Sequence, residues 1–215
     1  MNPQTERTIE ALKKNNYEVY YTETREEAKK LALSFIHEGD SVGVGGSVTL
    51  DQLDMITALR EGNYRFCDRY TGCPEKDDAA RRDALSADVF LMSSNAITEN
   101  GELYNVDGTG NRVSALIYGP KTVLVLAGVN KIVPDIDSAV LRVKTVTAPQ
   151  NCVRLKQPTY CSTTGHCLSV DQGKGTDMKA GCNAPCRICI NYVICAQQRF
   201  AGRIKVILIN EELGY

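Results

Sequence analysis

Three apolar segments limit the folds open to this chain more than any other feature of its sequence. Residues 87–92, 121–127 and 204–209 are rich in Val, Ile and Leu and are expected to be strands. Segments with the spacing of amphipathic helices lie between them, and one begins at the capping pair Thr24 and Glu27. Strands that alternate with helices of about 10 to 15 residues indicate a mostly parallel sheet with helices on both faces. The predicted fold class is therefore α/β.

The remaining elements are predicted from the same periodicities. Further strands are expected at 17–21, 40–44 and 64–67, and further helices at 5–14, 48–59, 75–85, 111–118, 135–145 and 185–198. Residues 97–106 are interrupted by Asn and Gly, which predicts a hairpin or an extended loop. Between 147 and 180 the regular patterns give way to Pro, Gly, Ser, Thr and Cys, so no regular structure is expected there.

The length and charge of the chain narrow its class of function. A chain of 215 residues fits a single domain over residues 1–215. Its formal net charge is −1 and its basic residues form no long run, so neither nucleic acid nor an anionic membrane is expected as a partner. The amino-terminal residues lack the features of a signal peptide, and no apolar run approaches the ~20 residues of a membrane helix. We therefore expect a cytoplasmic protein, and a homo-oligomer is compatible with these features.

The distribution of cysteines indicates a metal site. Seven of the nine cysteines fall between residues 152 and 195, whereas Cys67 and Cys73 stand apart. In a reducing compartment such a cluster favours metal binding over disulfides. Residues 147–198 are thus predicted to form a cysteine-rich, metal-binding subregion inside the domain. By spacing alone, the ligands are Cys182, Cys186 and Cys189 with one upstream partner, Cys161 or Cys167.

The cysteine spacing leaves the identity of the metal open. Thiolates either bind Zn²⁺ tetrahedrally or hold an iron–sulfur cluster, and both need four ligands. No histidine has the spacing of a zinc ligand, although His166 beside Cys167 is an alternative ligand. An iron–sulfur cluster is therefore the favoured cofactor, with zinc as the alternative. The competing interpretation is that the cysteines are reduced and packed as small apolar side chains.

Two polar segments follow strands directly and are candidates for a ligand site. Gly45-Gly46-Ser47 follows the strand at 40–44, where glycine lets a ligand approach the backbone and free N–H groups attract an anion. Ser47 is also a good helix cap, which explains the motif without a ligand. Because ligands bind beyond the carboxyl ends of parallel strands, this motif and residues 93–111 are expected to face one crevice.

The second segment is a polar loop that could hold a small polar or anionic ligand. Arg112 is its predicted anion clamp. The alternative is a long turn whose side chains bond to their own backbone. The residues predicted to bind the ligand, besides Gly45, Gly46 and Ser47, are Asn100, Asn105, Asp107, Gly108, Gly110, Asn111 and Arg112.

Three blocks of sequence occur in a characteristic order and spacing. The first is Val44-Gly45-Gly46-Ser47-Val48-Thr49-Leu50, the second spans 87–101 and 105–112, and the third runs from 128–133 through 148–151 to 187–189 and 203–209. Together they resemble the LUD (lactate utilisation) family. The resemblance implies a fold related to sugar-phosphate isomerases and CoA transferases. It also implies a part in the oxidation of L-lactate to pyruvate beside an iron–sulfur or oxidoreductase partner subunit.

The same resemblance bears on the metal ligands and on one carboxylate. The family pattern maps onto Cys161, Cys167, Cys182 and Cys189, and this chain departs from it by an insertion at 168–181 and by Cys186. Thr98-Glu99-Asn100-Gly101 resembles the motif that carries the nucleophilic glutamate of class I CoA transferases, which makes Glu99 a candidate catalytic nucleophile. A simple turn between two strands is the alternative.

Together these features predict a metal-bearing, iron–sulfur accessory or redox component of organic-acid oxidation. Two alternatives remain open. One is a stand-alone enzyme with CoA-transferase or sugar-phosphate isomerase chemistry that uses Glu99. The other is a ligand-sensing module without catalysis.

Overall fold

A six-stranded parallel sheet forms the centre of the protein, which a computed structural model describes over residues 1–215. The strand order is β1-β10-β7-β4-β2-β3, and every neighbouring pair is parallel. The strands are β1 (Glu18–Thr22), β2 (Ser41–Val44), β3 (Arg65–Phe66), β4 (Val89–Met92), β7 (Thr122–Gly128) and β10 (Ile204–Ile209). The predicted α/β class and the three apolar strands are confirmed.

Both faces of this sheet are buried, because its central strands are apolar on both sides. In β4, Phe90 and Met92 point into one hydrophobic cluster, whereas Val89 and Leu91 point into the other. Helices α2, α3 and α4 cover the second cluster, and α1 and α6 contribute to the first. The helices that flank the sheet are α1 (Pro3–Lys14), α2 (Arg25–Ser34), α3 (Val48–Gln52), α4 (Met55–Glu61), α5 (Pro74–Asp83) and α6 (Asn111–Ile117).

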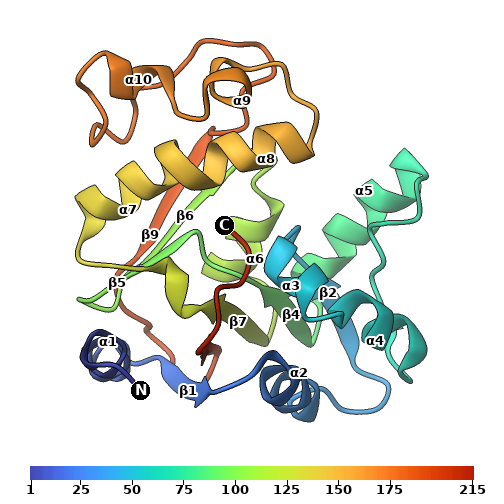
Figure 1. The fold of residues 1–215 in the computed structure, drawn as a ribbon. Helices are drawn as coiled ribbons and strands as arrows, with labels where there is room; N and C mark the ends of the chain where they lie inside the picture. Colours follow the sequence, from blue (N-terminus) through green and yellow to red (C-terminus); the bar gives the residue numbers. More distant parts are fainter.

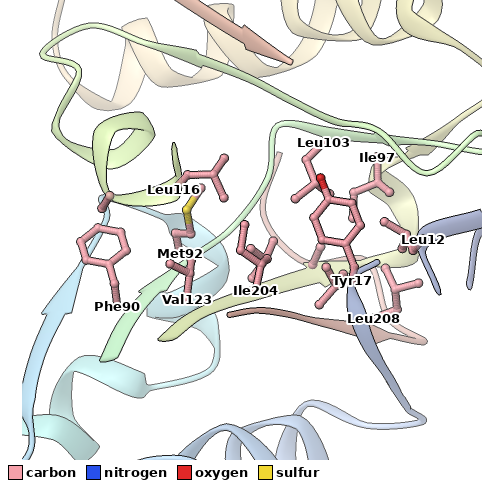
Figure 2. Packing of buried hydrophobic residues seen from close by; sticks show 14 of the residues in the cluster. Leu12, Tyr17, Phe90, Met92, Ile97, Leu103, Leu116, Val123, Ile204 and Leu208 are labelled. Atoms are coloured by element: carbon pink, nitrogen blue, oxygen red, sulfur yellow. The ribbon is translucent and has the colours of Figure 1, made fainter. Parts of the chain in front are cut away.

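A second sheet of four strands packs against the first. Its order is β8-β5-β6-β9, with β8 at Ile132–Val133, β5 at Ala96–Thr98, β6 at Leu103–Asp107 and β9 at Asn191–Cys195. The antiparallel pair β5–β6 is the predicted hairpin. Figure 2 shows Ile97 and Leu103 of this hairpin beside Tyr17, in the cluster that also holds Ile204 and Leu208 of the main sheet. The two sheets therefore share one core.

The cysteine-rich region is built on one long helical stretch. Helix α7 (Ile136–Arg142) continues through a π-helical segment (Val143–Thr147) into α8 (Ala148–Arg154). Two short helices, α9 (Tyr160–Thr164) and α10 (Leu168–Asp171), follow it. In Figure 1 these helices lie at the top of the view, above β6 and β9. The expectation that residues 147–180 lack regular structure was wrong for these three helices, α8 to α10.

Two other sequence-based expectations need correction. The helix predicted at 185–198 was wrong, because residues 191–195 form β9, which pairs antiparallel with β6. Strand pairing satisfies the backbone of both segments and overrides the helical spacing of the side chains. The helix predicted at 48–59 is split into α3 and α4, because Asp54 takes the left-handed conformation with φ 50°. No helix in the structure is both long and apolar enough to cross a membrane.

Candidate functional site

A cavity of about 430 Å³ lies beyond the carboxyl ends of the parallel strands. Gly46 and Ser47 follow β2, Ser93 and Ser94 follow β4, and Lys131 lies shortly after β7. The loop from Val106 to Arg112 supplies another wall. The basic residues of the wall come from five places along the chain: Arg69, Arg81, Arg112, Lys131 and Arg154. We call this space the cation-rich cavity.

The positive charge of the cation-rich cavity is largely uncompensated within the protein. Asp107 is the only Asp or Glu residue of its wall, and its Oδ2 lies 3.7 Å from Nε of Arg112. The Nε atoms of Arg69 and Arg81 are buried without a hydrogen-bond partner. Burial lowers the pKa of Arg69, and the neighbouring cations Arg81 and Arg154 lower it further. An unpaired buried N–H costs free energy, so an anion bound here would remove that cost.

Arg112 is held by the protein rather than free to bind a ligand. Its Nη1 donates to the carbonyl of Ser93 (3.0 Å) and to Oδ1 of Asn105 (2.5 Å). Its Nη2 donates to Oδ1 of Asn95 (3.0 Å) and to the carbonyl of Val106 (2.9 Å). Arg112 therefore ties the end of β4 to the end of β6. Gly45 makes room for it, because a Cβ at that position would lie 2.8 Å from Cγ of Arg112.

The ten predicted ligand residues, Arg112 among them, divide into two groups. Six of them line the cation-rich cavity: Gly46, Ser47, Asp107, Gly108, Asn111 and Arg112. The other four, Gly45, Asn100, Asn105 and Gly110, are not part of its wall. Ser47 also accepts a hydrogen bond of 3.4 Å from the backbone N–H of Leu50, so it caps α3 as the alternative interpretation holds. The binding roles of these residues stay predictions.

Glu99 lies away from the cation-rich cavity. Its carboxylate accepts hydrogen bonds from Nη2 of Arg7 (2.6 Å) and from Nε2 of Gln4 (3.0 Å), both on α1. These two bonds lower the pKa of the carboxyl group. Asn100 and Gly101 also face α1, because their carbonyls accept from Nδ2 of Asn15. This position links the turn to α1 and does not favour the predicted nucleophilic role.

Five of the cysteines surround a second, smaller cavity. Its volume is about 30 Å³, and its cysteines are Cys152, Cys161, Cys167, Cys182 and Cys189. Cys186, which the spacing also predicts as a ligand, is not part of its wall. The sulfurs of Cys152 and Cys161 are 3.7 Å apart. We call this space the thiol-lined cavity.

The thiol-lined cavity is apolar but has two cations at its edge. Burial raises the pKa of the Cys189 thiol to about 12, and the neighbouring thiols Cys152 and Cys161 add to this. Lys144 and Arg187 also line the cavity. Arg187 donates from Nε to the carbonyl of Cys189 (2.7 Å) and from Nη1 to the carbonyl of Cys182 (3.0 Å). One guanidinium thus fixes the backbone of two candidate ligands.

The arrangement of the thiols can be compared with what the two candidate cofactors require. No three Cys, His, Asp or Glu side chains are arranged so that they could hold a single metal ion. A zinc ion requires all four ligands around one point. In an iron–sulfur cluster each thiolate binds a different iron, so its ligands stand further apart around a common space. The thiols surround one small cavity, and both the iron–sulfur cluster and zinc stay predictions.

Comparison with known proteins identifies the family. The family model of the LUD domain matches residues 5–209. This chain belongs to the LUD domain family. A DUF162 family protein from Deinococcus radiodurans has a similar fold, with a TM-score of 0.51 at 10% identity over 96% of each chain. No curated protein sequence matches the chain.

Two further solved structures are more distant from this LUD protein. Ribose 5-phosphate isomerase A from Methanocaldococcus jannaschii has 12% identity and a TM-score of 0.41 over 89% of this chain and 96% of the other. The eIF2B delta protein from Chaetomium thermophilum has 20% identity and a TM-score of 0.37 over 51% of this chain and 48% of the other. Neither likeness is close enough to carry a conclusion about function.

The two cavities of the LUD protein share one side chain. Ile188 lines both the cation-rich cavity and the thiol-lined cavity. Its carbonyl oxygen would lie 3.2 Å from a Cβ at position 108, so a side chain there would be tightly packed against it. Whatever occupies one cavity is therefore a near neighbour of whatever occupies the other.

Several residues of these cavities do not stand out in the sequence. Lys131 follows the strongest strand, so the rule that ligands bind at carboxyl ends could have found it. Cys152 could have been grouped with the other thiols. The arginines Arg69, Arg81 and Arg154 come from a loop and two different helices, and no local motif marks them.

Proposed function

We propose that this LUD-domain protein carries an iron–sulfur cluster and works with oxidoreductase partner subunits in the oxidation of a small organic acid. Within the context of the family, the reaction is the conversion of L-lactate to pyruvate. One observation carries this proposal: five thiols surround one cavity, and Ile188 alone is common to that cavity and the cation-rich one. A redox centre beside an anion site suits the passage of the two electrons of the bound organic acid, one at a time, to the oxidoreductase partner subunits.

The residues of the thiol-lined cavity have separate roles in this proposal. Cys161, Cys167, Cys182 and Cys189 are the proposed ligands, as the family pattern implies, and Cys152 is a fifth thiol beside Cys161. The cluster, when bound, would supply one-electron transfer. Arg187 positions Cys182 and Cys189 through their carbonyls. Lys144 and Arg187 place positive charge beside thiolates that would otherwise be buried anions.

The cation-rich cavity is the proposed site of the organic anion. Arg69 and Arg81 each have a buried nitrogen without a partner, and Arg154 lines the same wall. A carboxylate accepts two hydrogen bonds from one guanidinium, so it suits these groups well. Arg112 has a different role, because it holds the ends of β4 and β6 in place.

Metal analysis of protein prepared without oxygen tests the cluster. We expect coloured protein with iron and acid-labile sulfide, and loss of most of the iron in Cys182→Ser and Cys189→Ser. Cys186→Ser is the matched control, because it lies in the same segment but outside the cavity wall, and it should keep its iron. Colourless protein with stoichiometric zinc would reject the cluster, and equal iron loss in the control would reject the proposed set of four ligands.

The stand-alone enzyme that uses Glu99 has less support. Glu99 is paired with Arg7 on α1 and is not part of either cavity. The ligand-sensing alternative differs from the proposal in one measurable respect. A sensor would be stabilised against heat by lactate or pyruvate without any electron transfer from the anion to the cluster.

A further inference from the structure

Lys131 is a buried amine without an acidic partner in the wall of the cation-rich cavity. Its side chain is 2% exposed. No carboxylate lies within ion-pair distance of its Nζ. The Nζ atom instead contacts two hydroxyl groups, Oγ1 of Thr49 at 2.9 Å and Oγ of Ser93 at 2.8 Å. Buried lysines are normally paired with a carboxylate, so this environment points to a chemical role.

The hydrogen bonds around Lys131 suit a neutral amine. The hydroxyl of Thr49 donates to the carbonyl of Leu213 (3.3 Å), and that of Ser93 donates to the carbonyl of Ser94 (3.5 Å). Each hydroxyl has a single proton, so both accept from Nζ of Lys131. Two N–H groups satisfy both hydroxyls. A neutral amine has two N–H groups and keeps one lone pair, whereas an ammonium group would leave its third N–H without a partner among these residues.

The electrostatic surroundings of Lys131 also favour the neutral amine. Burial lowers the pKa of Lys131 to about 7, and the cations Arg142 and Arg112 contribute to this. A large share of the amine is therefore neutral near neutral pH. Burial beside other cations is the usual way in which a protein activates a lysine as a nucleophile.

We propose that Lys131 is a nucleophilic amine that forms an imine with the carbonyl group of a small 2-oxo acid. The acid would be held through its carboxylate by the free cations of the cavity, Arg69 and Arg81 foremost. A 2-oxo acid suits this wall because it carries a carboxylate for the guanidinium groups and, next to it, a carbonyl for the amine. The inference rests on the proposed function only in that the cavity binds a small organic anion.

The step is balanced and needs no oxidant. The lone pair of Nζ attacks the carbonyl carbon, and the carbonyl oxygen takes up the proton that Nζ loses, through the hydroxyl of Ser93. The resulting carbinolamine loses its hydroxyl group and the second N–H proton as water. An imine remains between Nζ and the former carbonyl carbon.

Reductive trapping with cyanoborohydride, followed by peptide mapping, tests this imine. The purified protein is incubated separately with glyoxylate, pyruvate and 2-oxoglutarate, each with sodium cyanoborohydride. We expect at least one acid to add its own mass less one oxygen atom, with tenfold or more labelling at Lys131 over any other lysine. Acetone, which has a carbonyl but no carboxylate, should label far less. Labelling spread over exposed lysines, or none at Lys131 with all three acids, would overturn the proposal.

Variants separate chemistry from binding. Lys131→Met should abolish the specific label, whereas Lys121→Met, which replaces an exposed lysine outside the cavity, should retain it. Arg69→Met should raise the concentration of acid needed for half-maximal labelling about tenfold or more, which corresponds to a loss of ~1.4 kcal/mol. Unchanged labelling in Lys131→Met refutes the assignment. Since the wild-type peptide map locates the adduct directly, the conclusion does not depend on the folding of any variant.

The result for Lys131 can be distinguished from the result for the iron–sulfur cluster. Cys182→Ser is expected to lose iron yet keep the label at Lys131, because imine formation uses no electrons from the cluster. Label at Lys131 in a protein without any iron would leave this inference standing while the iron–sulfur proposal fails. The opposite result is a full complement of iron and sulfide, with pyruvate that raises the thermal midpoint but never labels Lys131. That result would support the iron–sulfur proposal and overturn the inference about Lys131.

Discussion

Replacement of Lys131 by Met gives a test of its charge that needs no ligand. The pKa of Lys131 falls from an ordinary value of 10.5 to about 7 because the amine is buried near Arg142 and Arg112. Between those two pH values the unfolded chain binds a proton that the folded protein does not. The free energy of unfolding therefore rises with pH across this range, and below pH 7 the protein carries the full cost of charging a buried amine. At ~1.4 kcal/mol per pH unit, that full cost is about 5 kcal/mol.

Methionine fills a similar space without an ionisable group, so Lys131→Met removes this pH dependence. We expect the wild type to gain about 2 kcal/mol relative to the variant between pH 7 and pH 9. The assay is urea denaturation of both proteins at pH 7, 8 and 9, because the difference between them cancels the titration of every other group. The variant should be the more stable protein at pH 7. A difference that stays constant with pH would show that Lys131 is charged in the folded state, and the reasoning would be refuted.

Two other substitutions follow from the geometry. Arg112→Lys should lower the free energy of unfolding by about 2 kcal/mol or more, because an ammonium group cannot reach all four acceptors that the guanidinium group now contacts. Each buried acceptor left without a partner costs ~1–3 kcal/mol. An unchanged urea midpoint would contradict this. Glu99→Gln should leave labelling of Lys131 and the binding of pyruvate unchanged, since Glu99 contacts α1 and neither cavity. Loss of either property in that variant would restore Glu99 to the active site.

The elements that the sequence predicts well are those whose environment is uniform. Val123, Val125 and Ala127 face one core while Leu124 and Leu126 face the other, so residues 123–127 of β7 are all apolar and predict a buried strand. The β5–β6 hairpin is marked by its own turn residues. In both cases local composition and tertiary environment agree.

The errors occur where a distant partner decides the structure. Residues 191–195 form a strand because the edge of β6 is available to pair with them, and nothing within residues 185–198 encodes that edge. The cation-rich cavity was predicted only from its backbone loops, because Arg69, Arg81 and Arg154 meet there from separate parts of the chain. Arg112 was predicted as a ligand clamp, yet the carbonyls that engage it belong to β4 and β6. Contacts of this kind exist only in the folded protein.

The stability of the cysteine-rich region provides the last prediction. Helices α9 and α10 have only five and four residues, and residues 172–190 contain neither helix nor strand. Such a segment buries little apolar surface against an ordering cost of ~1–2 kcal/mol per residue. Its backbone is held at a few places, among them the bond from the N–H of Cys167 to the carbonyl of Lys144.

We expect bound metal to provide most of the protection of this region against hydrogen exchange. Coordination by Cys161, Cys167, Cys182 and Cys189 joins α9, the start of α10 and the segment that leads into β9, and binding to the folded state alone stabilises it. Removal of the metal with a chelator should therefore speed exchange across residues 156–195, whereas β7, at the centre of the main sheet, should exchange at its original rate. Cys186→Ser should behave as the wild type in both states, because its thiol is not part of the cavity wall. Equal protection of residues 156–195 with and without metal would mean that the thiols are only packed against one another, and that the cavity between them is a feature of the core rather than a cofactor site.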